Sequence, residues 1–211
     1  DVYDVGVHVL SGVCPGEDVG EITCTRVSNA SSLIPTNNLI ANNHLTQKTL
    51  TTAYGGVHIR GVGDRFSHNL MHDAPGQFVT PNGPLTMLDH NEAFNTGYAE
   101  GDGGVMYDGM SLWGGYGMSY IGNFVHHSLE VPGLHGRGGI YFDGHQQGMS
   151  NVTLNVMYKA AGRAFLINGG AQASVTRNLI INSGTALYQE NYDLDTTPNQ
   201  LVDMLRAYDN G

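Results

Sequence analysis

The sequence is short of charge, and above all of positive charge. Its 211 residues include 9 Lys and Arg against 19 Asp and Glu, which gives a formal net charge of −10. Charged residues make up 13% of the chain, compared with roughly 25% in ordinary soluble domains. Proteins that bind nucleic acids carry clustered basic side chains, and this chain has no such cluster. We therefore expect no nucleic-acid partner.

Long apolar runs and the common cofactor motifs are missing as well. No apolar run approaches the roughly 20 residues that cross a bilayer, so we expect no membrane span. The sequence contains no phosphate loop, no His-Glu-x-x-His motif and no EF-hand loop, so we expect neither a cofactor nor a metal. What is abundant is glycine, with 30 residues, and asparagine, with 18. Both are poor helix formers, which excludes a helical bundle and favours a β-rich domain with many tight turns.

Cysteine is scarce too, and its two copies are close together in the sequence. Cys14 and Cys24 lie in a glycine-rich segment, where they form either a local disulfide or two free thiols. Two N-glycosylation sequons begin at Asn29 and Asn151. Together these features favour an extracellular or cell-surface protein.

A short repeat that begins with asparagine organises the chain. Its six copies are NNLIAN around Asn38, NLMHD from Asn69, NEAFN from Asn91, NFVHH from Asn123, NVMYK from Asn155 and NLIIN from Asn178. The intervals between copies are 31, 22, 32, 32 and 23 residues. This is a base period of 22 to 23 residues with insertions in some copies, and such a period is typical of a solenoid.

A second repeat, rich in glycine, alternates with the first. Its copies are GGVHIRG (55–61), GGVMYDG (103–109), GGIYFDG (138–144) and RAFLINGG (163–170). Each copy alternates apolar and polar residues, which predicts a β-strand. The side chains expected to point inward are Val57, Ile59, Val105, Tyr107, Ile140, Phe142, Phe165 and Ile167. Those expected to point outward are His58, Arg60, Met106, Asp108, Tyr141, Asp143, Leu166 and Asn168.

These repeats predict an all-β protein, a parallel β-helix with coils of about 22–32 residues. Coils of this fold stack at about 4.8 Å, and asparagines at a fixed turn position can hydrogen-bond from coil to coil. We expect the β-helix over residues 1–200 and a short C-terminal helix over 201–211, where Leu201, Leu205 and Tyr208 have helical spacing. Neither end resembles a cap. This predicts a segment of a longer solenoid, or a unit that stacks on copies of itself through open ends.

The stacking of coils predicts a polar column on the outer surface, formed by Arg60, Asp108, Asp143 and Asn168. Two carboxylates on neighbouring coils would lie about 5 Å apart, close to the roughly 5–5.5 Å between the catalytic carboxylates of retaining glycosidases. An outward aspartate before a glycine can equally be an ordinary turn residue.

Other candidate site residues lie close to these strands in the sequence. Asp102 precedes the strand at 103–109 and is a second candidate carboxylate. Aromatic rings stack on sugars, and an arginine can hold a substrate oxygen. The further substrate-binding candidates are His72, Trp113, Arg137, Tyr141 and His145. Most histidines and single arginines in such a chain are, however, solvated loop residues.

The chain resembles the right-handed parallel β-helix proteins of bacterial carbohydrate utilisation. The resemblance rests on 56–77, 90–109, 138–144 and 178–184, and extends to LVDMLRAYDNG at 201–211, which is similar to a C-terminal helix of these proteins. It is most similar to glycoside hydrolase family 141, which includes α-L-fucosidase and xylanase activities. This implies a right-handed, pectin-lyase-like solenoid and a polysaccharide or glycan partner.

The resemblance also implies a catalytic pair. Asp102 in DGGVMY and Asp143 in GIYFDG match the two aspartate motifs of the family. The chain departs from the family at Gly144, where a second aspartate is usual, and at Met110 and Ser111, where Arg-Asp often occurs. Two functions are therefore expected: a glycoside hydrolase, or a non-catalytic structural or carbohydrate-binding glycoprotein on the same scaffold.

Overall fold

In the part of the computed structural model that can be described, every regular element is a β-strand. The described residues are 7–9, 35–46, 56–59, 61–81, 83–99, 103–109, 116–129, 138–143, 148–160, 162–168 and 172–190. They form 19 strands, and no helix occurs among them. The expected class, all-β, is confirmed.

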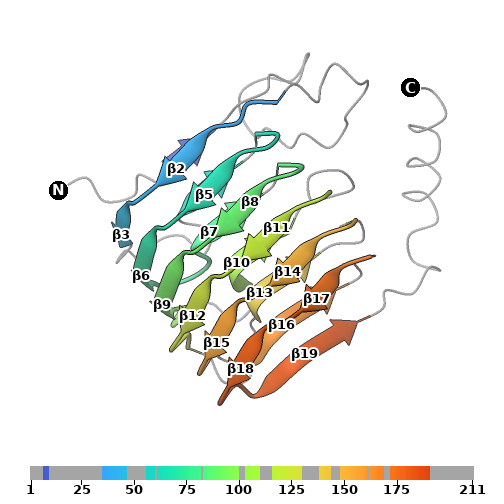
Figure 1. Ribbon diagram of the computed structural model, residues 1–211. Coiled ribbons are helices and arrows are strands. Elements are labelled where there is room, and N and C mark those ends of the chain that lie inside the picture. Colours follow the sequence, from blue (N-terminus) through green and yellow to red (C-terminus); the bar gives the residue numbers. More distant parts are fainter. Residues whose placement is uncertain are drawn as a thin grey trace.

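The strands form three parallel sheets that run side by side (Figure 1). Sheet 1 contains β1 (Val7–Val9), β4 (Val57–Ile59), β7 (Val79–Pro81), β10 (Gly104–Asp108), β13 (Gly138–Asp143), β16 (Arg163–Asn168) and β19 (Thr185–Glu190). Sheet 2 contains β2 (Leu39–Ala41), β5 (Arg65–Ser67), β8 (Met87–Asp89), β11 (Ser119–Ile121), β14 (Asn151–Thr153) and β17 (Ser174–Thr176). Sheet 3 contains β3 (His44–Thr46), β6 (Leu70–Ala74), β9 (Glu92–Thr96), β12 (Phe124–His126), β15 (Val156–Tyr158) and β18 (Leu179–Ile181).

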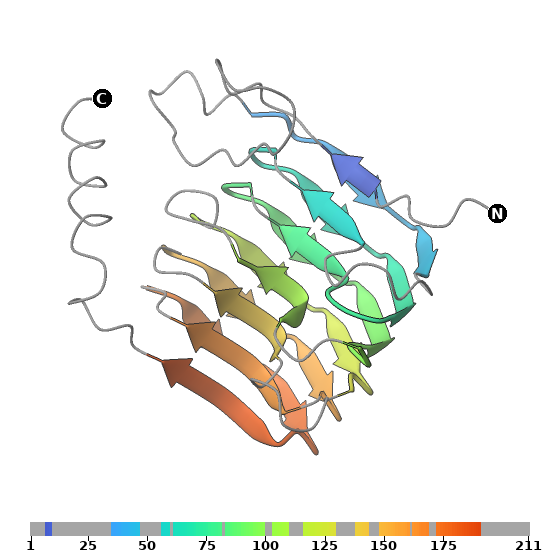
Figure 2. The same cartoon turned by 180° about the vertical axis from the view of Figure 1, so that it is seen from behind.

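The chain visits the three sheets in a fixed order, one strand in each, and then begins the next coil. Each strand pairs in parallel with the equivalent strand of the next coil, as β5 does with β8 and β8 with β11. Seen from behind, the coils form one continuous stack (Figure 2). This is the architecture of a parallel β-helix, as the two repeats indicate.

An asparagine ladder joins the coils at the turn between sheets 2 and 3. Its members are Asn43, Asn69, Asn91, Asn123, Asn155 and Asn178. The Oδ1 atom of each later member accepts hydrogen bonds from the backbone N and the Nδ2 of the member before it, at 2.9–3.1 Å. The spacings are 26, 22, 32, 32 and 23 residues, so the last four expected intervals are confirmed and the first is 26 residues instead of 31.

The first ladder position differs from the sequence expectation. Asn43, and not Asn38, is the ladder residue of its coil. Asn38 lies on the other side of β2, where its backbone N donates to Asp64 Oδ1 at 2.8 Å. The segment NNLIANN has asparagines on both sides of the strand, and the pattern alone aligned the wrong side.

Left-handed backbone recurs at the corners of the coil. At the corner between sheets 2 and 3, six residues that follow one another from coil to coil have φ between 53° and 65°: Asn42, His68, His90, Gly122, Leu154 and Arg177. Asn and Gly tolerate this conformation best, and His is among the residues enriched there. The corner geometry therefore belongs to the fold and not to any one side chain.

The interior is filled by apolar residues from all three sheets. The inward residues are Val57, Ile59, Val79, Met106, Ile140, Phe142, Phe165 and Ile167 in sheet 1, Ile40, Phe66, Leu88, Tyr120, Val152 and Val175 in sheet 2, and Leu45, Met71, Ala93, Val125, Met157 and Ile180 in sheet 3. Because strands of neighbouring coils are in register, these side chains stack along the axis and exclude water.

One strand has a different register from the expected one. Met106 aligns with Ile140, and Tyr107 aligns with Tyr141. Tyr107 therefore faces outward and Met106 inward, the reverse of the expectation. Asp108 aligns with Phe142 and is fully buried, so its expected place in the outer polar column is wrong. The physical reason is that a slip of one residue moves every side chain of a strand to the opposite face.

The expected C-terminal helix over 201–211 lies outside the described residues. In the part of the chain that is described, no helix is long and apolar enough to cross a membrane.

Candidate functional site

The outer face of sheet 1 is sheltered, although its side chains point away from the core. Tyr141, Leu166 and Asn168 are 5%, 2% and 8% exposed. Some outward residues of the other two sheets are much more open: Leu39 on sheet 2 and Leu179 on sheet 3 are more than half exposed. A sheltered outer face next to solvent is the usual setting of a ligand site.

Asp143 is held on this face by two neighbouring coils. The hydroxyl of Tyr107 donates to Asp143 Oδ2 at 2.6 Å, and Asn168 Nδ2 donates to Asp143 Oδ1 at 2.8 Å. Tyr107 belongs to the coil before that of Asp143. Asn168 belongs to the coil after it and aligns directly with Asp143. Asp143 itself is partly exposed. The carboxylate thus has a fixed orientation and access to solvent.

Two tyrosine rings lie beside this carboxylate, and an arginine lies towards the other end of the strands. The rings of Tyr107 and Tyr141 meet edge to face, with centroids 5.1 Å apart. Further along the face, the guanidinium of Arg163 lies over the ring of Tyr188, 3.8 Å from its centroid. Tyrosine presents an apolar ring with a polar tip, and arginine presents a planar fork of donors. This combination suits a ligand with many hydroxyl groups.

The structure places the sequence candidates in different parts of the coil. Tyr141 and Asp143 lie together on the outer face of sheet 1. Asp108 is buried in the core, and His72 lies on sheet 3 with its ring stacked on that of Phe94. Asn151 is partly exposed on β14. The candidates outside the described residues are Asp102, Arg60, Trp113, Arg137, His145, Asn29, Cys14 and Cys24.

The hydrogen bond of Gly103 lies at the opposite end of β13 from Asp143. The residue after Asp102 is Gly103, whose carbonyl accepts a hydrogen bond from Gly138 N at 3.0 Å. Gly138 begins β13 and Asp143 ends it. At roughly 3.3 Å per residue, the two ends of this strand are about 16 Å apart.

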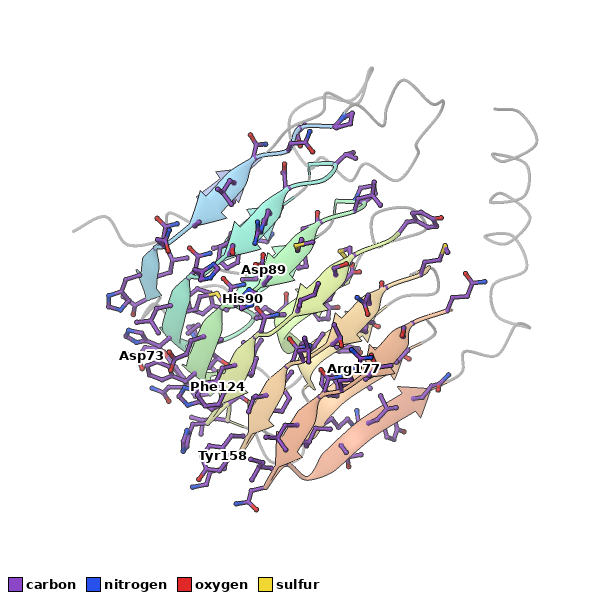
Figure 3. The ribbon with its side chains drawn as sticks, viewed as in Figure 1. Asp73, Asp89, His90, Phe124, Tyr158 and Arg177 are labelled. Carbon is purple, nitrogen blue, oxygen red and sulfur yellow. The ribbon has the colours of Figure 1, made fainter. Side chains whose placement is uncertain are left out.

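Sheet 3 carries a column of stacked rings that sequence analysis did not identify. His72, Phe94 and His126 lie on successive coils, each ring 4.8 Å from the next. Phe124 and Tyr158 lie beside them (Figure 3). The faces of the three rings pack against one another, so they stabilise the stack and do not offer a face to a sugar.

An ion pair links two coils on the outer face of sheet 2. Arg65 Nε and Nη2 donate to Asp89 Oδ1 and Oδ2, both at 2.7 Å. Asp89 is 2% exposed and also accepts hydrogen bonds from His90 and Ser67. Burial alone would raise the pKa of the Asp89 carboxyl, but the hydrogen bonds and the charge of Arg65 hold that pKa well below its usual range.

We expect Asp89 to make the stability of the protein depend on acid pH. A carboxyl whose pKa is lower in the folded state contributes stability that is present above its unfolded pKa of about 3.9 and is lost as the pH falls towards the folded value. Asp89→Asn should therefore lower the unfolding free energy by roughly 1–3 kcal/mol at pH 6. Below about pH 4 this difference should shrink by roughly 1 kcal/mol per pH unit.

Urea denaturation of both proteins at pH 6, 4 and 3 measures this difference. Glu92→Gln, which removes an exposed carboxylate from sheet 3, is the control. A difference between wild type and Asp89→Asn that stays constant from pH 6 to pH 3 would contradict the assignment.

No family model, curated protein or solved structure matches the chain.

Proposed function

We propose that the protein is an extracellular β-helix protein that acts on carbohydrate, with its site on the sheltered outer face of sheet 1. The observation that carries the proposal is Asp143, a partly exposed carboxylate fixed by Tyr107 and Asn168 among aromatic rings. The most specific reaction is hydrolysis of a glycosidic bond by two carboxylates, Asp143 and Asp102. The similarity of DGGVMY and GIYFDG to the aspartate motifs of glycoside hydrolase family 141 supports this choice.

In this reaction Asp143 acts as the nucleophile or as the base for a water molecule, and Asp102 acts as the acid. Tyr107 and Asn168 orient the Asp143 carboxylate through one hydrogen bond to each oxygen. A fixed carboxylate loses no side-chain entropy when the sugar binds, which favours attack. Tyr107 and Tyr188, which are partly exposed, offer rings for sugar contacts.

A second function is binding of a glycan without cleavage. It is favoured by the departures from the family's motifs at Gly144, Met110 and Ser111, where acidic or basic residues are usual. Such a protein would be a structural or cell-surface component that uses the same face for recognition.

The proposal extends to winding and location. We expect a right-handed, pectin-lyase-like coil, because crossovers between parallel strands of one sheet are right-handed in nearly all proteins. We also expect secretion, with a glycan on Asn151, whose side chain lies on the outer surface of sheet 2.

Assays on aryl fucosides, aryl xylosides and plant polysaccharides test the proposal. We expect wild-type protein to release product, or to bind at least one polysaccharide, and Asp143→Asn to lose that property. Full hydrolysis or binding by Asp143→Asn would refute the assignment of the site to this face.

A further inference from the structure

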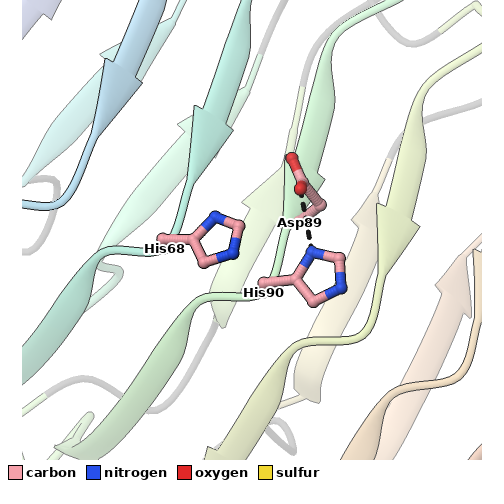
Figure 4. Close-up of side chains that lie close together, drawn as sticks. All are labelled: His68, Asp89 and His90. Atoms are coloured by element: carbon pink, nitrogen blue, oxygen red, sulfur yellow. Dashed lines mark hydrogen bonds and ion pairs between the residues drawn. The ribbon is translucent and has the colours of Figure 1, made fainter.

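Two histidines on neighbouring coils form a pair at the corner between sheets 2 and 3. His68 and His90 are both exposed, and their rings stack with centroids 5.0 Å apart and an interplanar angle of 16° (Figure 4). The stack ends at His90, because the next coil has Gly122 at this corner. One ring nitrogen of each histidine and one oxygen of Asp89 lie within 4.8 Å of one another.

The proton on His90 is placed by Asp89. His90 Nδ1 lies 2.9 Å from Asp89 Oδ2. Both oxygens of Asp89 form an ion pair with the guanidinium of Arg65, and an ionised carboxylate only accepts hydrogen bonds. His90 Nδ1 therefore carries the proton, which leaves the lone pair on Nε2.

The proton on His68 follows from that of Ser67. The hydroxyl of Ser67 donates its single proton to Asp89 Oδ2 at 2.9 Å. Ser67 Oγ also lies 2.6 Å from His68 Nδ1. Because its proton is already donated to Asp89, Ser67 Oγ can only accept a hydrogen bond from His68. His68 Nδ1 therefore also carries a proton, and its lone pair is on Nε2. Among the described residues, neither Nε2 atom has a hydrogen-bond partner.

We propose that His68 and His90 bind a divalent transition metal of the imidazole-preferring class, Zn²⁺, Cu²⁺ or Ni²⁺, through their two Nε2 atoms. Metal-bound histidines usually donate their other ring nitrogen to a carboxylate or another oxygen, as both do here. Asp89 is the positioning residue and not a ligand, because its oxygens are occupied by Arg65, Ser67 and His90.

Binding requires both rings to turn. A Zn–N bond is about 2.0–2.1 Å, so the two nitrogens must lie within about 4.2 Å of each other. The rings stack with centroids 5.0 Å apart, and both side chains are exposed, so each can rotate until its Nε2 points at a shared ion. The remaining ligand positions would be filled by water. A bound ion would join two coils outside the core and stabilise the stack.

Titration calorimetry of the whole chain with ZnCl₂ tests the proposal, with thermal melting as the second readout. The variants are His68→Asn and His90→Asn, because Asn42 already occupies this corner with the same left-handed backbone. We expect one Zn²⁺ per wild-type chain, a loss of affinity of at least tenfold in each variant, and a Zn²⁺-dependent rise of the melting temperature in wild type alone. We expect Asp89→Asn to weaken binding by roughly tenfold.

The matched control is His127→Asn. His127 is also a left-handed corner residue, and its Nδ1 lies 2.9 Å from that of His126. We expect this control to bind Zn²⁺ as wild type does. Undiminished binding in either His68→Asn or His90→Asn, or a loss confined to His127→Asn, would overturn the proposal. Absence of binding by wild type at millimolar Zn²⁺ would overturn it as well.

Discussion

Asn123→Ala should lower the melting temperature of the protein by on the order of 10 °C, which corresponds to a loss of about 3–5 kcal/mol. Asn123 is fully buried, and its Oδ1 accepts hydrogen bonds from the backbone N and Nδ2 of Asn91 at 3.0 Å. Its Nδ2 donates to the carbonyl of Leu88 at 2.9 Å and to Asn155 Oδ1 at 3.0 Å. Alanine would leave buried polar groups without these partners, and each such group costs about 1–3 kcal/mol.

Thermal and urea denaturation of Asn123→Ala measure this effect. The matched control is Asn151→Ala, which removes an asparagine from the outer surface of sheet 2 and should change stability by no more than about 0.5 kcal/mol. A melting temperature for Asn123→Ala within about 2 °C of wild type would mean that the ladder contributes little to stability.

Asp143→Asn should lower the rate of glycoside hydrolysis at least about 100-fold, because loss of a catalytic acid or base typically costs 10²–10⁴-fold. Asparagine has nearly the same shape and keeps an oxygen for one of the two donors, Tyr107 or Asn168. The protein should therefore stay folded, and the loss would be chemical.

Two further variants separate chemistry from positioning. Tyr107→Phe removes only the hydrogen bond to Asp143 Oδ2, so we expect a smaller loss, about tenfold. Glu92→Gln removes an exposed carboxylate from sheet 3, whereas Asp143 lies on sheet 1, and should leave the rate unchanged. Hydrolysis by Asp143→Asn at the wild-type rate would contradict the role of this residue.

The repeats predicted the coil well because they have a physical cause. Asparagine is the side chain that can accept from one coil and donate to the next, so its recurrence at 22 to 32 residues marks the turn. The pattern misplaced its first copy because Asn38 and Asn43 flank the same strand. Only the hydrogen bonds between coils distinguish the two.

The register of β10 could not be predicted from the glycine repeats. The sequences GGVMYDG and GGIYFDG align best through their glycines and their aspartates, which pairs Asp108 with Asp143. The structure pairs Asp108 with Phe142 instead. Tyr107 therefore points to the outer face and Asp108 to the core, the reverse of the prediction. Tyr107 then donates the hydrogen bond to Asp143. A period-two pattern identifies a strand, but it does not determine the register of that strand when both faces of the sheet are largely buried.

The histidine pair had a signal in the sequence that was not used. Ser67-His68-Asn69 and Asp89-His90-Asn91 are equivalent triplets, 22 residues apart, directly at the ladder. The repeat was defined as beginning at the asparagine, so the histidine before it lay outside the pattern. The hydrogen bonds that hold Asp143 had no such signal, because Tyr107 and Asn168 lie 36 and 25 residues away from it in the sequence.

The location of a bound sugar tests the central claim most directly. A crystal structure of the protein with an oligosaccharide from the best polysaccharide substrate or ligand would give this location. We expect the sugar on the outer face of sheet 1, within hydrogen-bond distance of Asp143 and in contact with Tyr107 or Tyr188. A sugar bound only to the outer faces of sheets 2 and 3, with the surroundings of Asp143 unchanged, would contradict the proposed function.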